Sequence, residues 1–79
     1  MSREKNELLY EIASWRSKDF YNRMDTPWRA VNYKLDDKCK RMLNVLEREY
    51  TEKYGELPEW RFINDVWKTL HELREELYG

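Results

Sequence analysis

Residues 26–55 read TPWRAVNYKLDDKCKRMLNVLEREYTEKYG, and this stretch decides the fold. Thr26 is a good helix N-cap, and Pro27 suits the first helical position because its missing N–H would have no partner there. No further Pro or Gly follows until Gly55, which can adopt the left-handed conformation that ends a helix. The stretch therefore predicts one helix over residues 27–54, about 42 Å long at 1.5 Å per residue.

One apolar stripe runs the whole length of this predicted helix. Its members recur in steps of three or four, and the pattern repeats after eleven residues. An eleven-residue repeat averages about 3.67 residues per turn, so the stripe stays on one side of a nearly straight helix. We therefore expect this helix to be the spine on which the rest of the chain packs. The stripe consists of Trp28, Val31, Leu35, Cys39, Met42, Leu46 and Tyr50.

Two further amphipathic segments flank the predicted spine. Residues 3–24 repeat apolar side chains at helical spacing, and Pro58 opens a second such segment over residues 58–78. The connections between the predicted helices are about three residues long, which favours antiparallel neighbours. The sequence therefore predicts a single all-α domain over residues 1–79. It would be a small up-down-up three-helix bundle around a long central helix, with helices at 3–24, 27–54 and 58–78.

Composition limits the class of protein. A chain of 79 residues forms one small domain, and its 41% hydrophobic and 39% charged residues argue against disorder, which requires low hydrophobicity and high net charge. The single Cys39 cannot form an internal disulfide, so a reducing cytoplasm is the expected location. The first residues lack the apolar run of a signal peptide, and no stretch is apolar for long enough to span a membrane. We expect no membrane partner.

Patterns for catalysis and metal binding are weak throughout. The only histidine, His71, has no second imidazole one turn later, as the zinc-protease pattern requires. Cys39 lies on the apolar stripe, where a thiol behaves as a small hydrophobic side chain. Asp36 and Asp37 point about 100° apart on a helix, and each precedes a basic residue by four positions, which indicates solvated ion pairs. The sequence therefore predicts no enzyme, no cofactor and no metal site.

The net charge of −1 conceals an uneven distribution of charge. Residues 16–41 contain eight basic and four acidic side chains, whereas residues 42–79 contain five basic and nine acidic ones. This asymmetry predicts a dipolar molecule. The basic part also carries tyrosines, and together they form a basic and aromatic band around the first turn. The band comprises Arg16, Lys18, Tyr21, Arg23, Arg29, Tyr33 and Lys34.

Three interpretations of this band compete. Arginine and lysine beside exposed aromatic rings can bind single-stranded nucleic acid through backbone charge and base stacking. The same residue types supply most hot spots of protein interfaces. The band can also be an ordinary solvated surface. Interrupting aspartates and the acidic third segment disfavour the nucleic-acid interpretation.

Aromatic residues make up 15% of the chain, more than a small helical core obviously needs, and surplus Trp and Tyr often mark interfaces. The leading hypothesis is a non-enzymatic protein–protein interaction module, a small cytoplasmic adaptor or inhibitor. Small phage-encoded proteins that bind host machinery often have this character. One alternative is a nucleic-acid-binding regulatory protein that uses the band. Another is a self-assembling structural protein, in which basic surfaces meet the acidic third helix of another copy.

The predicted spine outruns its neighbours, so we expect part of its stripe to stay uncovered. Tyr50 or Tyr54 at one end, or Trp28 at the other, would then be exposed. Another protein or a second copy of the chain would cover them. The candidate partner-binding residues are Arg16, Tyr21, Arg23, Trp28, Arg29, Tyr33, Lys34, Tyr50 and Tyr54.

Overall fold

Three α-helices make up the fold. The computed structural model describes residues 3–24 and 30–79. The helices are α1 (Arg3–Arg23), α2 (Tyr33–Tyr54) and α3 (Ile63–Tyr78). None of these three described helices is both long enough and apolar enough to cross a membrane. The prediction of a small all-α, three-helix protein is confirmed.

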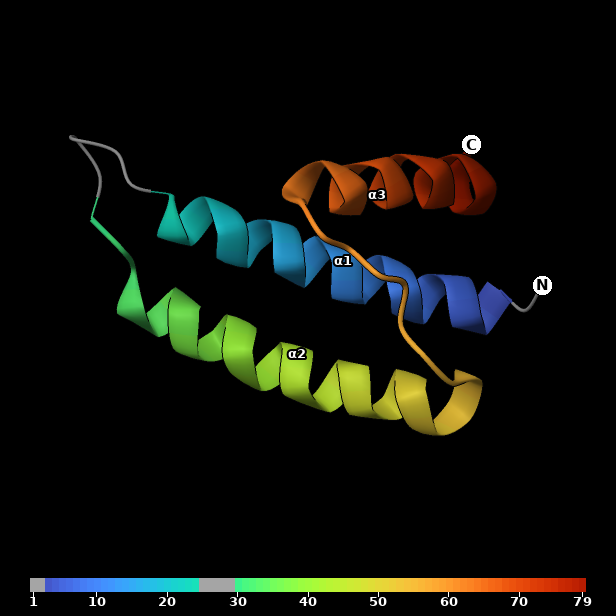
Figure 1. Cartoon of the computed structure of the whole chain (residues 1–79), viewed down its shortest axis with the longest axis horizontal. Coiled ribbons are helices and arrows are strands. Elements are labelled where there is room, and N and C mark those ends of the chain that lie inside the picture. The colour runs from blue at the N-terminus through green and yellow to red at the C-terminus, as the bar shows by residue number, and fades with distance from the viewer. Residues whose placement is uncertain (1–2, 25–29) are drawn as a thin grey trace.

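The central helix is α1, so the prediction that residues 27–54 form the spine is wrong. α2 and α3 each pack on α1 and not on each other (Figure 1). α1 buries adjacent pairs, Leu8 with Leu9 and Ile12 with Ala13. Neighbouring residues on a helix point about 100° apart, so each pair faces two partners rather than one. The core cluster joins Leu8, Leu9 and Ile12 of α1 with Leu46 and Tyr50 of α2 and Leu73 of α3.

The helix directions also differ from the predicted up-down-up order. α2 is antiparallel to α1 (Figure 1). α3 is antiparallel to α1 as well. Asn6 near the start of α1 donates to Glu76 near the end of α3, and Ser17 accepts from Trp67 in the first half of α3. α2 and α3 therefore run in the same direction, and the order is up-down-down.

An extended connection over residues 55–62 makes this arrangement possible. It runs back across α1, from the end of α2 to the start of α3 (Figure 1). Leu57 and Trp60 pack against the core cluster on the way. The Trp60 indole also donates to the Thr69 hydroxyl at 3.0 Å, which ties the connection to α3. The prediction of a three-residue turn between the second and third helices is therefore wrong.

The start of α3 is set by Asp65, not by Pro58. The Asp65 carboxylate accepts hydrogen bonds from the backbone N–H groups of Arg61 and Phe62, each at 3.0 Å. A carboxylate at this position satisfies donors that precede the first helical turn and interacts favourably with the helix dipole. α3 therefore begins at Ile63, and the predicted start at residue 58 is wrong.

α2 also begins later than predicted. Pro27 lies outside the described residues, but residues 30–32 are not helical, so the predicted continuous helix from 27 is wrong. Asn32 is the N-cap, and its side chain accepts the Leu35 N–H at 3.1 Å. Asparagine caps helices at least as well as threonine. The side chain of Asn22 fixes this cap from α1 by bonding to both the N–H and the C=O of Asn32.

The end of α2 lies where the sequence predicts it. Gly55 has φ 96°, and its N–H donates to the Thr51 carbonyl at 3.2 Å. The shorter α2 leaves no uncovered end there: Tyr50 is only 3% exposed, and Tyr54 is half-buried against the core cluster. The expected exposure of Tyr50 is therefore wrong, because α1 covers this end of α2. The alternative position, Trp28, lies outside the described residues.

Candidate functional site

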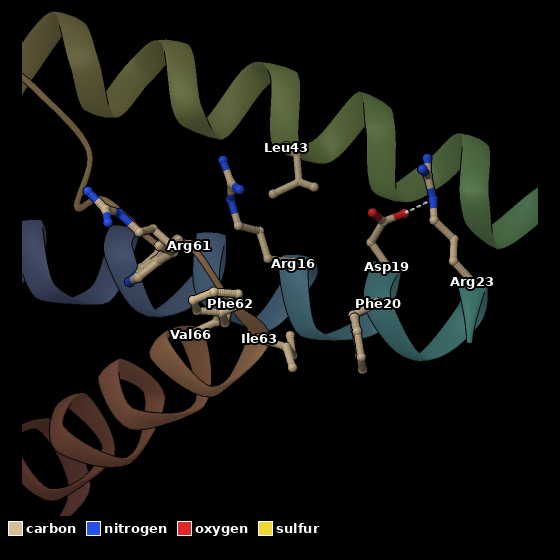
Figure 2. A pocket seen from close by; sticks show the side chains of 10 residues that line it. Arg16, Asp19, Phe20, Arg23, Leu43, Arg61, Phe62, Ile63 and Val66 are labelled. Atoms are coloured by element: carbon tan, nitrogen blue, oxygen red, sulfur yellow. Dashed lines mark hydrogen bonds and ion pairs between the residues drawn. The ribbon is translucent and has the colours of Figure 1, made fainter. Parts of the chain in front are cut away.

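A hollow of about 280 Å³ lies where the 55–62 connection crosses α1 and enters α3. All three helices contribute to it. Figure 2 shows Leu43 reaching it from α2, Arg16 from α1, and Ile63 from the first turn of α3. It is lined by Arg16, Asp19, Phe20, Arg23, Leu43, Trp60, Arg61, Phe62, Ile63 and Val66.

Phe62 is the most exposed apolar side chain of this hollow, at 73%. Its backbone is nevertheless fixed, because the Phe62 N–H donates to the Asp65 carboxylate and the residue is the N-cap of α3. Phe20, also part of the lining, is 37% exposed. The hollow thus offers two phenyl rings, carried by an ordered backbone, that a partner could cover.

Arg16 crosses from α1 to α2 at one wall of the hollow. Its guanidinium donates twice to the Glu47 carboxylate, at 2.6 and 3.1 Å, and lies 5.4 Å from the centre of the Trp60 ring. These contacts orient the side chain and neutralise its charge. Charge-assisted, two-donor contacts of this kind are among the stronger side-chain hydrogen bonds.

Arg23 is held in the same way at the far end of the hollow. It bonds Asp19 on its own helix and Asp36 on α2, both at 3.1 Å. The charge of Asp19, followed by that of Asp36, raises the pKa of Arg23. The pKa of Asp36 is lowered, chiefly by a hydrogen bond from Lys40 at 3.0 Å and further by Arg23.

Arg61 completes the set of guanidinium groups around the hollow. It pairs with Glu59 at 3.1 Å, and both side chains are largely exposed. All three arginines of the lining therefore have a carboxylate partner. The rim is polar and near neutral. A partner would therefore be held there by hydrogen bonds and apolar contact rather than by attraction between net charges.

The hollow brings together only part of the predicted band. Arg16 and Arg23 line it. Tyr21 instead stacks on the Trp67 ring, with 5.7 Å between centroids, and borders a second hollow with His71. Lys18 lies over the Trp15 ring at 4.4 Å. These described members of the band therefore have different surroundings.

The other predicted residues are dispersed. Tyr33 and Lys34 are exposed at the start of α2, Tyr33 at 77%. Tyr50 lies in the core. Trp28 and Arg29 lie outside the described residues. Sequence reasoning missed Phe20, Phe62 and Ile63 as site residues. The only local signal was Asp65 three residues after Phe62, which marks a helix start but not an exposed ring.

In the part of the chain that the structure describes, no cluster of side chains suits a metal ion, and the free cysteine is buried. No group of three or more His, Cys, Asp or Glu residues there is placed to hold a metal ion. Cys39 is 0% exposed, and burial raises the pKa of its thiol. A raised thiol pKa opposes formation of the reactive thiolate. The prediction that Cys39 fills the core is confirmed.

Comparison with protein-family models, with curated proteins and with solved structures finds no match to this chain. Two surfaces of the described residues stand out: the hollow around Phe62 and the outer face of α2, where Val45 is 63% exposed.

Proposed function

We propose that this chain is a protein–protein interaction module with no catalytic chemistry of its own, and that it binds its partner at the Phe62 hollow. The single observation that carries the proposal is the 73% exposure of a phenyl ring on a fixed backbone at the mouth of that hollow. Covering such a side chain contributes about 1.5–3 kcal/mol. Aromatic and arginine side chains together are the usual composition of interface hot spots.

The hollow favours one kind of partner. Its three arginines are already paired with carboxylates, so a strongly acidic partner gains little from them. Phe20, Leu43 and Ile63 offer apolar contact around the hollow. A partner that inserts one large apolar side chain, with polar groups around it, fits this arrangement. An adaptor or inhibitor of a cytoplasmic protein is the corresponding role, and the single buried cysteine suits a reducing compartment.

Differential capture tests the proposal. The tagged chain is incubated with a lysate of the cell that makes it, in parallel with Phe62→Ser and with Tyr33→Ser. Tyr33 is a matched control because it is an equally accessible aromatic side chain, 77% against 73% exposed, away from the hollow. We expect at least one protein to be retained by the wild type and by Tyr33→Ser but lost by Phe62→Ser. If all three chains retain the same proteins, the hollow is not the binding site.

A further inference from the structure

The outer face of α2, defined by its exposed basic side chains, carries positive charge that no described carboxylate neutralises. One of these side chains, Lys38, lies at the edge of the face next to α1, with its Nζ 5.7 Å from the centre of the Trp15 ring. Lys34, Lys38, Arg41 and Arg48 are all exposed. In contrast to the arginines of the hollow, none of them forms an ion pair with a described residue. At about 100° per residue, the four lie within about 40° of one line along the helix. They form a basic stripe.

An apolar hollow interrupts this basic stripe. Val45 is 63% exposed, and it lines a hollow of about 470 Å³ together with Met42, Lys38 and Arg41. A phosphate backbone would neutralise the cations and leave Val45 and Met42 uncovered. A protein helix with carboxylates and one large apolar side chain would neutralise the cations and also cover Val45 and Met42. The face therefore fits an acidic amphipathic helix better than a nucleic acid.

Such a helix is present in this chain. Glu72 and Glu75 of α3 are exposed and form no ion pair with a described residue. Tyr78 follows after the same interval of three and is 65% exposed, with one ring edge against Tyr10. Residues three apart are neighbours on a helix surface. α3 thus presents two carboxylates and an aromatic ring in a row.

The spacing of the charges matches between the two helices. Lys38 and Arg41 are three residues apart, as are Glu72 and Glu75, so each pair spans about 4.5 Å along its helix. Side by side and parallel, the helices would place Lys38 opposite Glu72 and Arg41 opposite Glu75.

The same alignment continues into the apolar part of both surfaces. Val45 lies about 10.5 Å beyond Lys38, and Tyr78 lies about 9 Å beyond Glu72. The Tyr78 ring is therefore level with the hollow that Val45 lines, and it reaches that hollow from the side, because Tyr78 lies about 120° around α3 from Glu72. Two charge pairs and one aromatic contact coincide in a single register.

The fold itself supplies the parallel orientation. α2 and α3 of one chain run in the same direction on either side of α1 (Figure 1). A second copy that is displaced without being reversed brings its α3 parallel to α2 of the first copy. The two contacting surfaces differ, so every copy retains one unused surface of each kind and the contact does not close on itself.

We propose that the outer face of α2 binds α3 of a second copy of this chain, head to tail, through Lys38 and Arg41 against Glu72 and Glu75, with Tyr78 in the hollow beside Val45. This self-association uses surfaces separate from the Phe62 hollow. Whether or not the chain self-associates in this way, the proposed binding of another protein at the Phe62 hollow is tested by a separate experiment.

Light scattering on the wild-type chain provides the first test. At low ionic strength the mean mass should rise with concentration above 9.9 kDa and continue beyond that of a dimer. It should return to that of the monomer in about 1 M salt, where charges are screened beyond about 3 Å. A wild-type mass that stays monomeric at every concentration overturns the proposal.

Two double variants give the decisive test. Lys38→Gln with Arg41→Gln removes the basic half of the contact, and Glu72→Gln with Glu75→Gln removes the acidic half. All four side chains are exposed, so both variants should fold. Each alone should associate about tenfold or more weakly than the wild type. A mixture of the two retains one intact contact and should form a 1:1 complex that grows no further.

A matched control removes two positive charges elsewhere. Lys5→Gln with Arg74→Gln has the same net charge as the basic-half variant but leaves the basic stripe intact, and it should associate as the wild type does. The proposal fails if this control loses association as fully as Lys38→Gln with Arg41→Gln. It also fails if the chain stays monomeric but binds a fluorescent single-stranded oligonucleotide through Lys38 and Arg41, which would make the stripe a nucleic-acid site.

Discussion

The side chain of Asn22 forms a pair of hydrogen bonds with the backbone of Asn32. Its Oδ1 accepts the Asn32 N–H at 3.0 Å, and its Nδ2 donates to the Asn32 carbonyl at 2.9 Å. An asparagine side chain matches a peptide group in donor and acceptor, so this contact replaces a missing backbone pairing. Asn22 is 2% exposed at the end of α1, and it thereby fixes the residue that caps α2.

Replacing Asn22 with alanine should therefore destabilise the fold out of proportion to the small volume removed. The Asn32 N–H loses its partner, the Asn32 carbonyl keeps only the Asp36 N–H, and the N-cap of α2 loses its support. We expect the free energy of unfolding to fall by about 1–3 kcal/mol in a denaturant titration. Asn44→Ala is the control, since Asn44 is exposed on α2 and should change stability by no more than about 0.5 kcal/mol. Equal effects of the two substitutions would show that the Asn22–Asn32 pair is unimportant.

Local signals in the sequence located the three helices and the start of α1, but not the starts of α2 and α3. Gly55 ends α2 as its backbone freedom predicts, because the signal and the structure it sets are adjacent. The start of α2 depends instead on Asn22, which is distant in sequence from the cap it supports. Thr26 and Pro27 form a good local start signal, but no local pattern shows that Asn32 receives tertiary support. A helix start fixed from another element cannot be found by scanning for caps.

The sequence did contain a signal for the central position of α1, which is the width of its apolar face. The regular spacing of apolar residues does not reveal that width. A helix that packs on one partner needs one stripe, which residues 27–54 display clearly. Leu8 with Leu9 and Ile12 with Ala13 instead make a wider apolar face, which can serve two partners. The Phe62 hollow had no comparable signal, because it forms only when a connection between helices crosses α1.

Ile12 tests the central role of α1 directly. It is 0% exposed in the cluster that joins all three helices, so Ile12→Ala should lower the free energy of unfolding by about 2–5 kcal/mol. Ile12→Val should cost only about 0.5–1.5 kcal/mol, because most of the side chain remains. Val31 lies on the predicted stripe of the second helix but is 38% exposed, and Val31→Ala should cost less than Ile12→Ala. If Val31→Ala lowered the free energy of unfolding more than Ile12→Ala, the second helix rather than α1 would be the centre of the fold.

Cys39 should resist alkylation in the folded chain. It is fully buried, and burial raises the pKa of its thiol, so both access and thiolate formation are suppressed. At neutral pH, iodoacetamide should modify the native protein more than about 100-fold more slowly than the denatured protein, since reaction requires opening of the fold. Mass spectrometry measures both rates. Similar rates for native and denatured protein would contradict the burial of Cys39.

Asp36 should make stability fall in acid. Its pKa lies below the ordinary value of 3.8, chiefly because Lys40 donates a hydrogen bond to the carboxylate, and Arg23 lowers it further. A carboxyl group whose pKa is lower in the folded chain stabilises the fold above its ordinary pKa. That contribution is lost as the pH falls through the lower, folded value.

Denaturant titrations from neutral pH down to about pH 2 detect this loss by comparing the wild type with Asp36→Asn. The asparagine variant lacks the titrating group, so it should be less stable than the wild type at neutral pH, and the difference should shrink as the pH falls below 3.8. Asp37→Asn is the matched control, because Asp37 is exposed and forms no ion pair with a described residue. An Asp36→Asn difference that is independent of pH would mean that the pairs with Arg23 and Lys40 do not stabilise the folded chain.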